Sequence, residues 1–580
     1  MRAMSRGSKL LVLLLSFVLI VATACGGDDD NASEEGKGAD DTVPEEEVPT
    51  GGEVTYASDQ EPTGWNPNTG NDSLAALAYM AKLVYPQTFI TMPDFTVEPD
   101  QNLLVSAEQT ETDPQTIEYK LNPDAVWSDG TPISVEDYIY AWKIQNGTVD
   151  ADLGESDPEA AVPDDTTIPD VASTAGYDRI ETIEATDDEG KTFNVVYSEP
   201  FADWQSLFAD MVPAHVLKDV KGWNEGMDTD KIPEWSGGPF KFEDYKPEQS
   251  VNLVPNEEYW GPKPKIDRIV VRFGIEAPAL PQALENEEID MAYPQPQTDV
   301  LQQLQDIPGI KTQVNFGLSY EHLDFNLLNP LLADKAVREA IALGLDREDL
   351  IERTVKQFDD RAEVLNNRLW MNNQEEYEDH GGDYAFDPDK ATKTLEDAGY
   401  AKGSDGIYAK DGKRLSFRIS TTGGNKLRED TEQVILDQLK EIGIEITIAN
   451  VDGGAVFDKF FPESGNFADA DFDIALFAWV QTPYISGNVD LFSTGRGQNE
   501  TSYSNPKVDE LFQEASSATD RDEVVRLSNE ADAEMWKDLP TIPLYAKPTL
   551  LPYRDTLVNI IDNASTFGPL WNATTWGVKK

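Results

Sequence analysis

Apolar and polar positions alternate in two distinct periods along the chain from residue 52 onward. Apolar residues alternate with polar ones over 415–419 and 444–448, while 474–478 is continuously apolar. Between the first two, residues 428–442 carry an apolar stripe with helical spacing. The first two patterns predict half-buried strands and the third a fully buried strand. This order of strands and helices predicts a parallel sheet with crossover helices, and hence an α/β fold.

Several helix ends are marked by residues that suit them. Asp387 precedes Pro388 and an apolar stripe that ends before Gly399, the order expected of an N-cap, a first turn and a C-terminal stop. Asp334 precedes a segment with one wide apolar face, and Asp346 restarts the helical pattern with an acidic residue three positions later. We therefore expect helices directly after these three aspartates.

The N-terminus has the pattern of a signal peptide. Arg2, Arg6 and Lys9 precede the mainly apolar segment 10–24, which is short for a membrane span, and the only cysteine of the chain, Cys25, follows it. This arrangement resembles a bacterial lipobox, in which cleavage precedes a lipidated cysteine. We expect a lipoprotein signal peptide at 1–24 and lipidation of Cys25; the alternative is a buried cysteine behind a simple secretory signal.

Residues 25–52 are acidic, with one lysine and no aromatic residue. Such a segment cannot bury enough apolar surface to fold by itself, so we predict a lipid-anchored tether rather than a calcium site. The segment 146–177 is also acidic, with three prolines and little periodicity, and is expected to be an excursion on a subdomain surface.

Composition excludes several classes of function. The formal net charge of −62 argues against a nucleic-acid partner, because phosphate binding requires a basic surface. One cysteine excludes a disulfide framework and CxxC sites, and the three histidines have no metal-ligand spacing. We therefore expect no metal and no cofactor. The acidity also suggests a source that tolerates salt, since acidic surfaces keep halophilic proteins soluble.

Two other kinds of chemistry find weak sequence support. Ser504 and Lys507 form an S-x-x-K match, but Pro506 argues against an ordinary helix there, and no K-T-G or G-x-S-x-G occurs. We therefore expect no serine-hydrolase activity and no enzyme. Residues 469–473 begin like a calcium loop, but the glycine and glutamate that such a loop needs are missing, so a solvated strand edge is expected.

Ordered motifs between about residues 55 and 550 resemble those of the extracytoplasmic solute-binding proteins of ABC importers, family 5, the oligopeptide and dipeptide type. The matching segments are Trp65-Asn66-Pro67, Trp127 to Pro132 with Val135 to Trp142, Gly237 to Phe240, Asn256 to Asp267, Asp334 to Arg347, Ala398 to Tyr400, Leu439 to Ile444 and Pro540 to Tyr545.

This resemblance implies a two-lobed periplasmic-binding-protein clamshell with an extra subdomain on the first lobe. It implies lobe I at 53–95, its extra subdomain at 96–205, the second part of lobe I at 206–319, lobe II at 320–535, and a return segment of lobe I at 536–580. It also implies a monomer on the outer face of the bacterial cell membrane, which captures a peptide or peptide-like ligand and delivers it to ABC permease subunits. A solute-sensing or surface-interaction lipoprotein of the same fold is the alternative.

The resemblance also implies a set of ligand-binding residues, for each of which ordinary core packing is the alternative. Trp479 is favoured, because it follows a buried strand whose carboxyl end should face the ligand crevice. Many family members carry an aspartate for a peptide ammonium group about three residues later, where this chain has no acidic residue. Recognition of a free N-terminus is therefore not expected to follow the family pattern. The expected residues are Glu61, Trp65, Tyr140, Tyr320, Trp479, Gln481, Thr482 and Tyr484.

Overall fold

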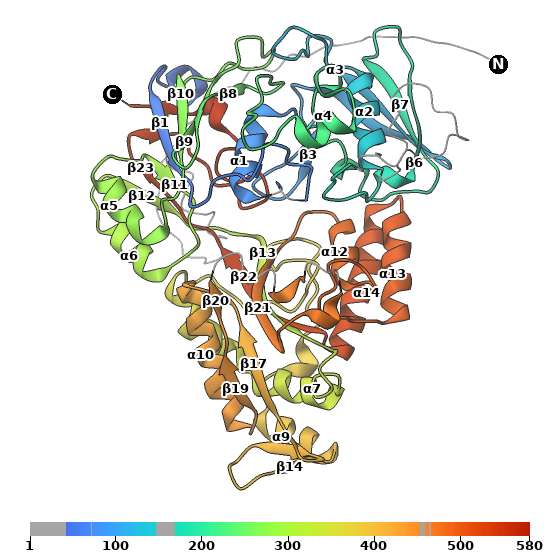
Figure 1. The fold of residues 1–580 in the computed structure, drawn as a ribbon, viewed down its shortest axis with the longest axis vertical. Coiled ribbons are helices and arrows are strands. Elements are labelled where there is room, and N and C mark those ends of the chain that lie inside the picture. The colour runs from blue at the N-terminus through green and yellow to red at the C-terminus, as the bar shows by residue number, and fades with distance from the viewer. Residues whose placement is uncertain are drawn as a thin grey trace, which may run out of the picture.

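Two lobes of mixed α/β structure make up the body of the protein (Figure 1). The computed structural model describes residues 42–70, 72, 74–146, 169–452, 459–462 and 466–579. The predicted signal peptide, Cys25 and most of the predicted tether lie outside the described residues.

The first lobe is built on a seven-stranded sheet. Strand β1 (Glu53–Ala57) pairs in parallel with β10 and β11, and its inward residues Val54 and Tyr56 are buried. The other strands, in sheet order, are β12 (Ile310–Gln313), β23 (Leu551–Arg554), β11 (Met291–Ala292), then β1, β10 (Arg268–Arg272), β9 (Ser250–Pro255) and β8 (Phe240–Lys246). Helices of this lobe include α1 (Ala75–Val84), α3 (Ala214–Leu217), α4 (Val220–Glu225), α5 (Leu280–Glu285) and α6 (Thr298–Gln305).

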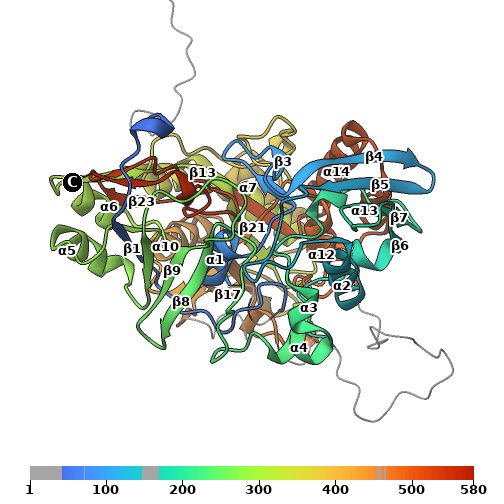
Figure 2. The ribbon, with the colours of Figure 1, turned by 90° about the horizontal axis from the view of Figure 1, so that it is seen from above.

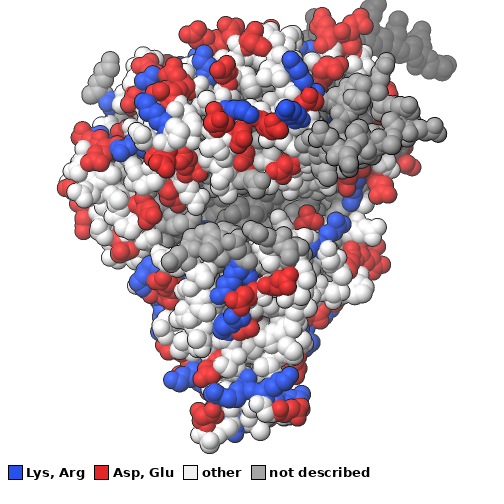
Figure 3. All heavy atoms as spheres, in the orientation of Figure 1, with Lys and Arg blue, Asp and Glu red and all other residues white. Residues whose placement is uncertain are grey.

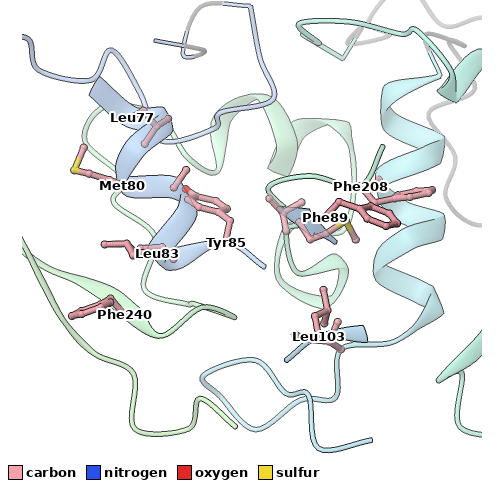
Figure 4. Packing of buried hydrophobic residues seen from close by; sticks show 14 of the residues in the cluster. Leu77, Met80, Leu83, Tyr85, Phe89, Leu103, Phe208 and Phe240 are labelled. Carbon is pink, nitrogen blue, oxygen red and sulfur yellow. The ribbon is translucent and has the colours of Figure 1, made fainter. Parts of the chain in front are cut away.

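A four-stranded antiparallel sheet forms the extra subdomain. Helix α2 (Val135–Gln145) covers it and begins at a capping box, in which the Ser134 and Asp137 side chains bond each other's backbone amides. Its strands in order are β4 (Leu104–Thr112), β5 (Gln115–Leu121), β7 (Thr192–Tyr197) and β6 (Ile180–Ala185). One hydrophobic core joins subdomain and lobe, and Figure 4 shows residues of α1 such as Leu77 and Met80 together with Phe89, Leu103 and Phe208 in this core.

The second lobe contains a five-stranded sheet in the order β19 (Glu445–Ile448), β17 (Ser416–Ser420), β21 (Ile474–Val480), β13 (Phe316–Phe325) and β22 (Thr541–Pro548). Strand β17 pairs in parallel with β19 and β21, as the sequence pattern predicts. Strand β13, however, pairs antiparallel with both β21 and β22, so the sheet is mixed rather than parallel.

The predicted helices of this lobe are present. Asp334, Asp346 and Asp387 accept hydrogen bonds from backbone amides at the starts of α7 (Lys335–Gly344), α8 (Arg347–Arg353) and α9 (Pro388–Asp397). The helix expected at 428–442 is α10 (Lys426–Glu441), which starts two residues earlier because Asn425 caps it. The remaining long helices are α12 (Ser486–Phe492), α13 (Pro506–Ser517) and α14 (Arg521–Asp538), which share a separate hydrophobic cluster.

The chain crosses between the two sheets at residues 314–315 and 549–550, not near 320 and 535. Strands β13 and β22 pair with each other along most of their length, so 316–319 and 536–548 lie with the second sheet rather than the first. At the crossing, the Thr549 amide donates to the Asn315 carbonyl (2.7 Å), and both side chains donate to the carboxylate of Asp562 (2.6 and 2.9 Å).

The remaining described strands are short. They are β2 (Phe89–Thr91), β3 (Val97–Pro99), β14 (Ala401–Lys402), β15 (Tyr408–Lys410), β16 (Lys413–Arg414), β18 (Thr422–Gly423), β20 (Val451–Asp452), β24 (Leu557–Val558) and β25 (Gly577–Val578). Within the described part of the chain, no helix combines the length and the apolar character needed to cross a membrane.

Candidate functional site

A cavity of about 360 Å³ lies between the lobes. The second lobe contributes Thr482, Tyr484, Ser486, Gly487 and Asp490, which follow β21 and begin α12. The first lobe contributes residues from five separate parts of the sequence. These are Pro67 and Asn68; Lys82, Gln87, Phe89 and Thr91; Gln145, Ala172, Ser173, Ala175 and Tyr177; Gln205, Ser206, Leu207 and Ala209; and, from the end of the chain, Thr566 and Phe567. A ligand in this cavity would contact both lobes.

Trp479 lies within β21 rather than after it, because the strand continues to Val480. Its indole stacks on the imidazole of His322 (ring centres 6.1 Å apart, planes at 12°) and meets Phe477 and Phe461 edge-on. The side chain is half-buried. Trp479 is therefore held rigidly by aromatic neighbours while part of its surface stays accessible.

Two buried hydrogen-bond donors lie beside Trp479. Tyr320 is its cross-strand neighbour on β13, and Gln481 is two residues further along and donates its backbone amide to the Leu318 carbonyl (2.9 Å). Within the described structure, neither the Tyr320 hydroxyl nor the Gln481 Nε2 has a hydrogen-bond partner. Burial raises the pKa of Tyr320, so its hydroxyl keeps its proton. Buried donors without acceptors are costly, and a bound acceptor would satisfy them.

Thr482 and Tyr484, two of the expected ligand-binding residues, line the cavity. The Tyr484 hydroxyl also donates to the Gln205 carbonyl of the first lobe (3.0 Å). Next to it, the amide of Ser486 donates to the carboxylate of Asp203 (2.6 Å), which is buried. Burial raises the pKa of Asp203.

Further contacts between the lobes join the subdomain to α13. The Ala202 amide donates to the Ser516 carbonyl (2.9 Å), and Arg179 Nη1 donates to the same carbonyl (3.1 Å) and to Ser517 Oγ (3.3 Å). Figures 1 and 2 both place α13 beside the subdomain strands. We call these contacts, with Tyr484–Gln205 and Ser486–Asp203, the inter-lobe bridge.

Of the eight expected site residues, the described cavity wall includes Thr482 and Tyr484, whereas Tyr320, Trp479 and Gln481 are not among its lining residues. The other three lie in the first lobe, away from the cavity. Trp65 is fully buried, donates to the Thr229 carbonyl (3.1 Å) and packs edge-on against Phe242 and Tyr245. Glu61 accepts hydrogen bonds from the Tyr245 hydroxyl (2.6 Å) and from the amide of Glu248 (3.0 Å). Both fasten the segment after β1 to the β8–β9 hairpin, and neither lines the cavity.

Tyr140 also belongs to the core. It is buried on α2, packs near Trp223 and donates to the Asp219 carbonyl (3.1 Å). The alternative of ordinary packing therefore describes Trp65 and Tyr140, because each finds both an aromatic neighbour and a hydrogen-bond acceptor inside its own lobe.

Sequence reasoning missed a buried ion pair in the cavity wall. Lys82 Nζ donates to both carboxylate oxygens of Asp210 (3.0 and 2.9 Å) and to Gln87 Oε1 (3.2 Å), and it lies 5.0 Å from the ring centre of Phe567. Lys82 and Asp210 are 128 positions apart. No local sequence pattern signals a pair at such a separation.

Ser504 and Lys507, the S-x-x-K match, have different hydrogen-bond partners. Ser504 bonds Thr494 Oγ1 (3.0 Å), whereas Lys507 bonds Glu510 (2.9 Å). The expectation that Pro506 argues against an ordinary helix is wrong. Pro506 occupies the first position of α13, where its missing N–H is harmless. Ser504 therefore precedes the helix.

The acidic run at 469–473 gives no metal site in the described structure. Asp471 and Asp473 pair with Arg418 (2.6 and 3.2 Å). More generally, no group of three His, Cys, Asp or Glu side chains suited to a metal occurs among the described residues.

Comparisons with known proteins agree with this architecture. The sequence profile of the bacterial extracellular solute-binding proteins, family 5 (middle part), matches residues 98–501. The oligopeptide-binding protein OppA of Mycobacterium tuberculosis is 27% identical over 515 residues, covering 88% of this chain and 82% of OppA. The oligopeptide-binding protein AppA of Bacillus subtilis is 25% identical over 503 residues, covering 85% and 86%.

Solved structures of other binding proteins share this fold. The periplasmic EDTA-binding protein EppA superposes with a TM-score of 0.85 at 29% identity, over 95% of this chain and 100% of EppA. Bacillus subtilis AppA, in complex with a nonapeptide, gives 0.74 at 22% identity, over 92% and 100%. Since the profile spans most of the chain and the two-lobed fold is shared, this protein belongs to the bacterial extracellular solute-binding proteins of family 5.

Proposed function

We propose that this protein is the substrate-binding component of an ABC importer and captures peptides or peptide-like solutes between its lobes. One observation carries the proposal: the cavity has a wall built from both lobes, with neutral hydrogen-bonding and aromatic side chains. Pockets of this size and composition suit small polar ligands. The buried donors of Tyr320 and Gln481 beside Trp479 support it, because peptide carbonyls are acceptors for such groups.

Capture follows from the two-lobed architecture. A ligand that contacts both lobes favours the closed state by its difference in affinity for the closed and open states. The crossings at 314–315 and 549–550 are the points about which the lobes would turn, and the Asn315–Thr549–Asp562 contacts hold them side by side. The closed form would then dock on permease subunits in the membrane, with no covalent step.

Binding of defined ligands tests the proposal. Purified protein, unfolded and refolded to remove any bound solute, is titrated by calorimetry with mixtures of peptides of two to nine residues. Binding of at least one peptide class with about micromolar affinity is expected. No binding by any peptide, with intact folding by circular dichroism, would reject the peptide ligand.

A metal chelate is a second candidate ligand. Lys547 of β22 donates to Gln295 Oε1 of the first lobe (2.5 Å) and forms no ion pair with a carboxylate of the described residues. Burial and the nearby Arg428 guanidinium lower the pKa of Lys547 to about 8. Arg428 is itself paired with Glu321 (2.9 Å), so Lys547 is the group that could meet a carboxylate of such a ligand. The same titration should therefore include Fe(III)–EDTA.

We also propose that Cys25 carries the lipid anchor and holds the protein on the outer face of the cell membrane. The order of basic residues, apolar segment and lone cysteine supports this. In a bacterial host, the Cys25→Ala variant should move from the membrane fraction to the soluble extracytoplasmic fraction. An unchanged membrane fraction would contradict the anchor.

A further inference from the structure

We propose that the inter-lobe cavity receives an uncharged, hydrogen-bonding part of the ligand, such as a blocked or internal peptide segment, and disfavours a free ammonium or carboxylate end. The inference rests on the proposed function and deepens it by naming the ligand chemistry. It comes from the charged groups of the described cavity wall, each of which has an opposite charge of the protein nearby.

The cation of the wall is neutralised inside the protein. Lys82 and Asp210 expose only 8% and 13% of their side chains, and the lysine contacts both carboxylate oxygens. Gln87 bonds both members of the pair, because its Nε2 donates to Asp210 (2.7 Å) and its Oε1 accepts from Lys82 (3.2 Å). A ligand carboxylate would have to displace Asp210 from Lys82. Asp210 belongs to the same chain and is already aligned with the lysine.

The carboxylate of the wall has an opposite charge nearby, although both side chains are partly exposed and too far apart for a hydrogen bond. Among the described lining residues Asp490 is the only acid, and it lies 4.0 Å from the guanidinium of Arg496. Burial, together with the nearby Asp178, raises the pKa of Asp490. The neighbouring Asp203 is buried beneath the wall, where its carboxylate accepts from the Ser486 amide and Arg521 lies nearby.

The rest of the described wall is neutral. It offers amide and hydroxyl groups, from Asn68, Gln145, Gln205, Ser206, Thr482 and Thr566, and aromatic faces from Phe89, Tyr177, Tyr484 and Phe567. The described wall therefore has one basic and one acidic residue, in a chain with 108 acidic and 46 basic residues. An ion entering the cavity loses water without gaining an opposite charge, whereas a neutral amide exchanges one set of hydrogen bonds for another.

The test uses one peptide sequence in four end states: both ends free, N-acetylated, C-amidated, and both. Calorimetry at pH 7 should show that blocking at least one end tightens binding by about tenfold or more. If binding is equal or weaker in all three blocked forms, the inference is overturned while peptide capture stays intact. If none of the four binds, and the peptide mixtures also fail, the proposed function falls and the inference with it.

Variants of the wall sharpen the test. Thr482→Asp places an unpaired carboxylate on the cavity and should shift preference toward the free-amine peptide by about tenfold, whereas Thr482→Asn, which adds no charge, should not. Asp490→Asn should leave the preference between free and blocked ends unchanged. If Asp490→Asn selectively weakens the free-amine peptide, Asp490 holds an ammonium group and the inference is wrong. Melting curves establish that each variant is folded.

Discussion

Trp479 and Trp65, two tryptophans among the expected site residues, differ in their surroundings. Trp479 keeps an accessible surface beside unpartnered donors, whereas Trp65 is buried and hydrogen-bonded in the first lobe. Trp479→Ala should therefore weaken ligand binding by about a hundredfold with a small decrease in melting temperature, as expected when an aromatic anchor is lost. Trp65→Phe should lower the melting temperature and leave affinity unchanged. Calorimetry and thermal melts separate the two; unchanged binding by Trp479→Ala would make it a packing residue.

The buried Glu432 on α10 should make the stability of the folded protein depend on pH. It is fully buried, accepts from Asn450 Nδ2 (2.6 Å), and its other carboxylate oxygen has no partner among the described residues. Burial raises its pKa from 4.5 to about 7. The folded state thus holds this proton more tightly than the unfolded chain, so its contribution to stability is present below pH 4.5 and is lost as pH rises to about 7.

Glu432→Gln should accordingly stabilise the protein at pH 8, by about 2–3 kcal/mol, and make little difference near pH 4. Urea unfolding at the two pH values measures this. The same change at the exposed Glu348 of α8 is the control and should have no such pH dependence. Equal effects of Glu432→Gln at both pH values would contradict the assigned pKa.

At the scale of elements, the inter-lobe bridge should affect every ligand equally. Arg179 contacts α13 but does not line the cavity. Arg179→Met should reduce the closed population and weaken all ligands by one common factor of about three to tenfold. The matched control is Arg526→Met on α14, whose guanidinium bonds Glu523 and Glu530 among the described residues. Ligand-dependent losses in Arg179→Met, measured by calorimetry, would indicate direct contact instead.

The predictability of elements depends on how local their determinants are. The starts of α7, α8 and α9 were predicted because the capping aspartate adjoins its helix. The crossings between sheets were misplaced, because an apolar strand such as β22 does not encode which sheet it joins. The resemblance implied Thr482 and Tyr484, which line the cavity. The Lys82–Asp210 pair was missed, because its members are far apart in sequence and no local pattern signals it.

At the scale of the whole molecule, acidic side chains are spread over both lobes on the face shown in Figure 3. With a net charge of −62, the folded state repels itself, so added salt should stabilise it. The melting temperature should rise most between about 10 and 150 mM KCl, where the screening length falls from about 30 to 8 Å. A midpoint that is constant or falls with KCl would contradict a salt-adapted surface.

The central claim is that a peptide or peptide-like solute is held between the two lobes. Native mass spectrometry of the protein purified under gentle conditions tests it most directly, followed by denaturation and identification of whatever is released. We predict a one-to-one complex whose extra mass corresponds to peptides or their neutral derivatives, and which is lost on unfolding. A protein of bare mass that also gains no adduct from a peptide mixture at about 100 μM, a concentration that detects even weak complexes, would contradict the claim.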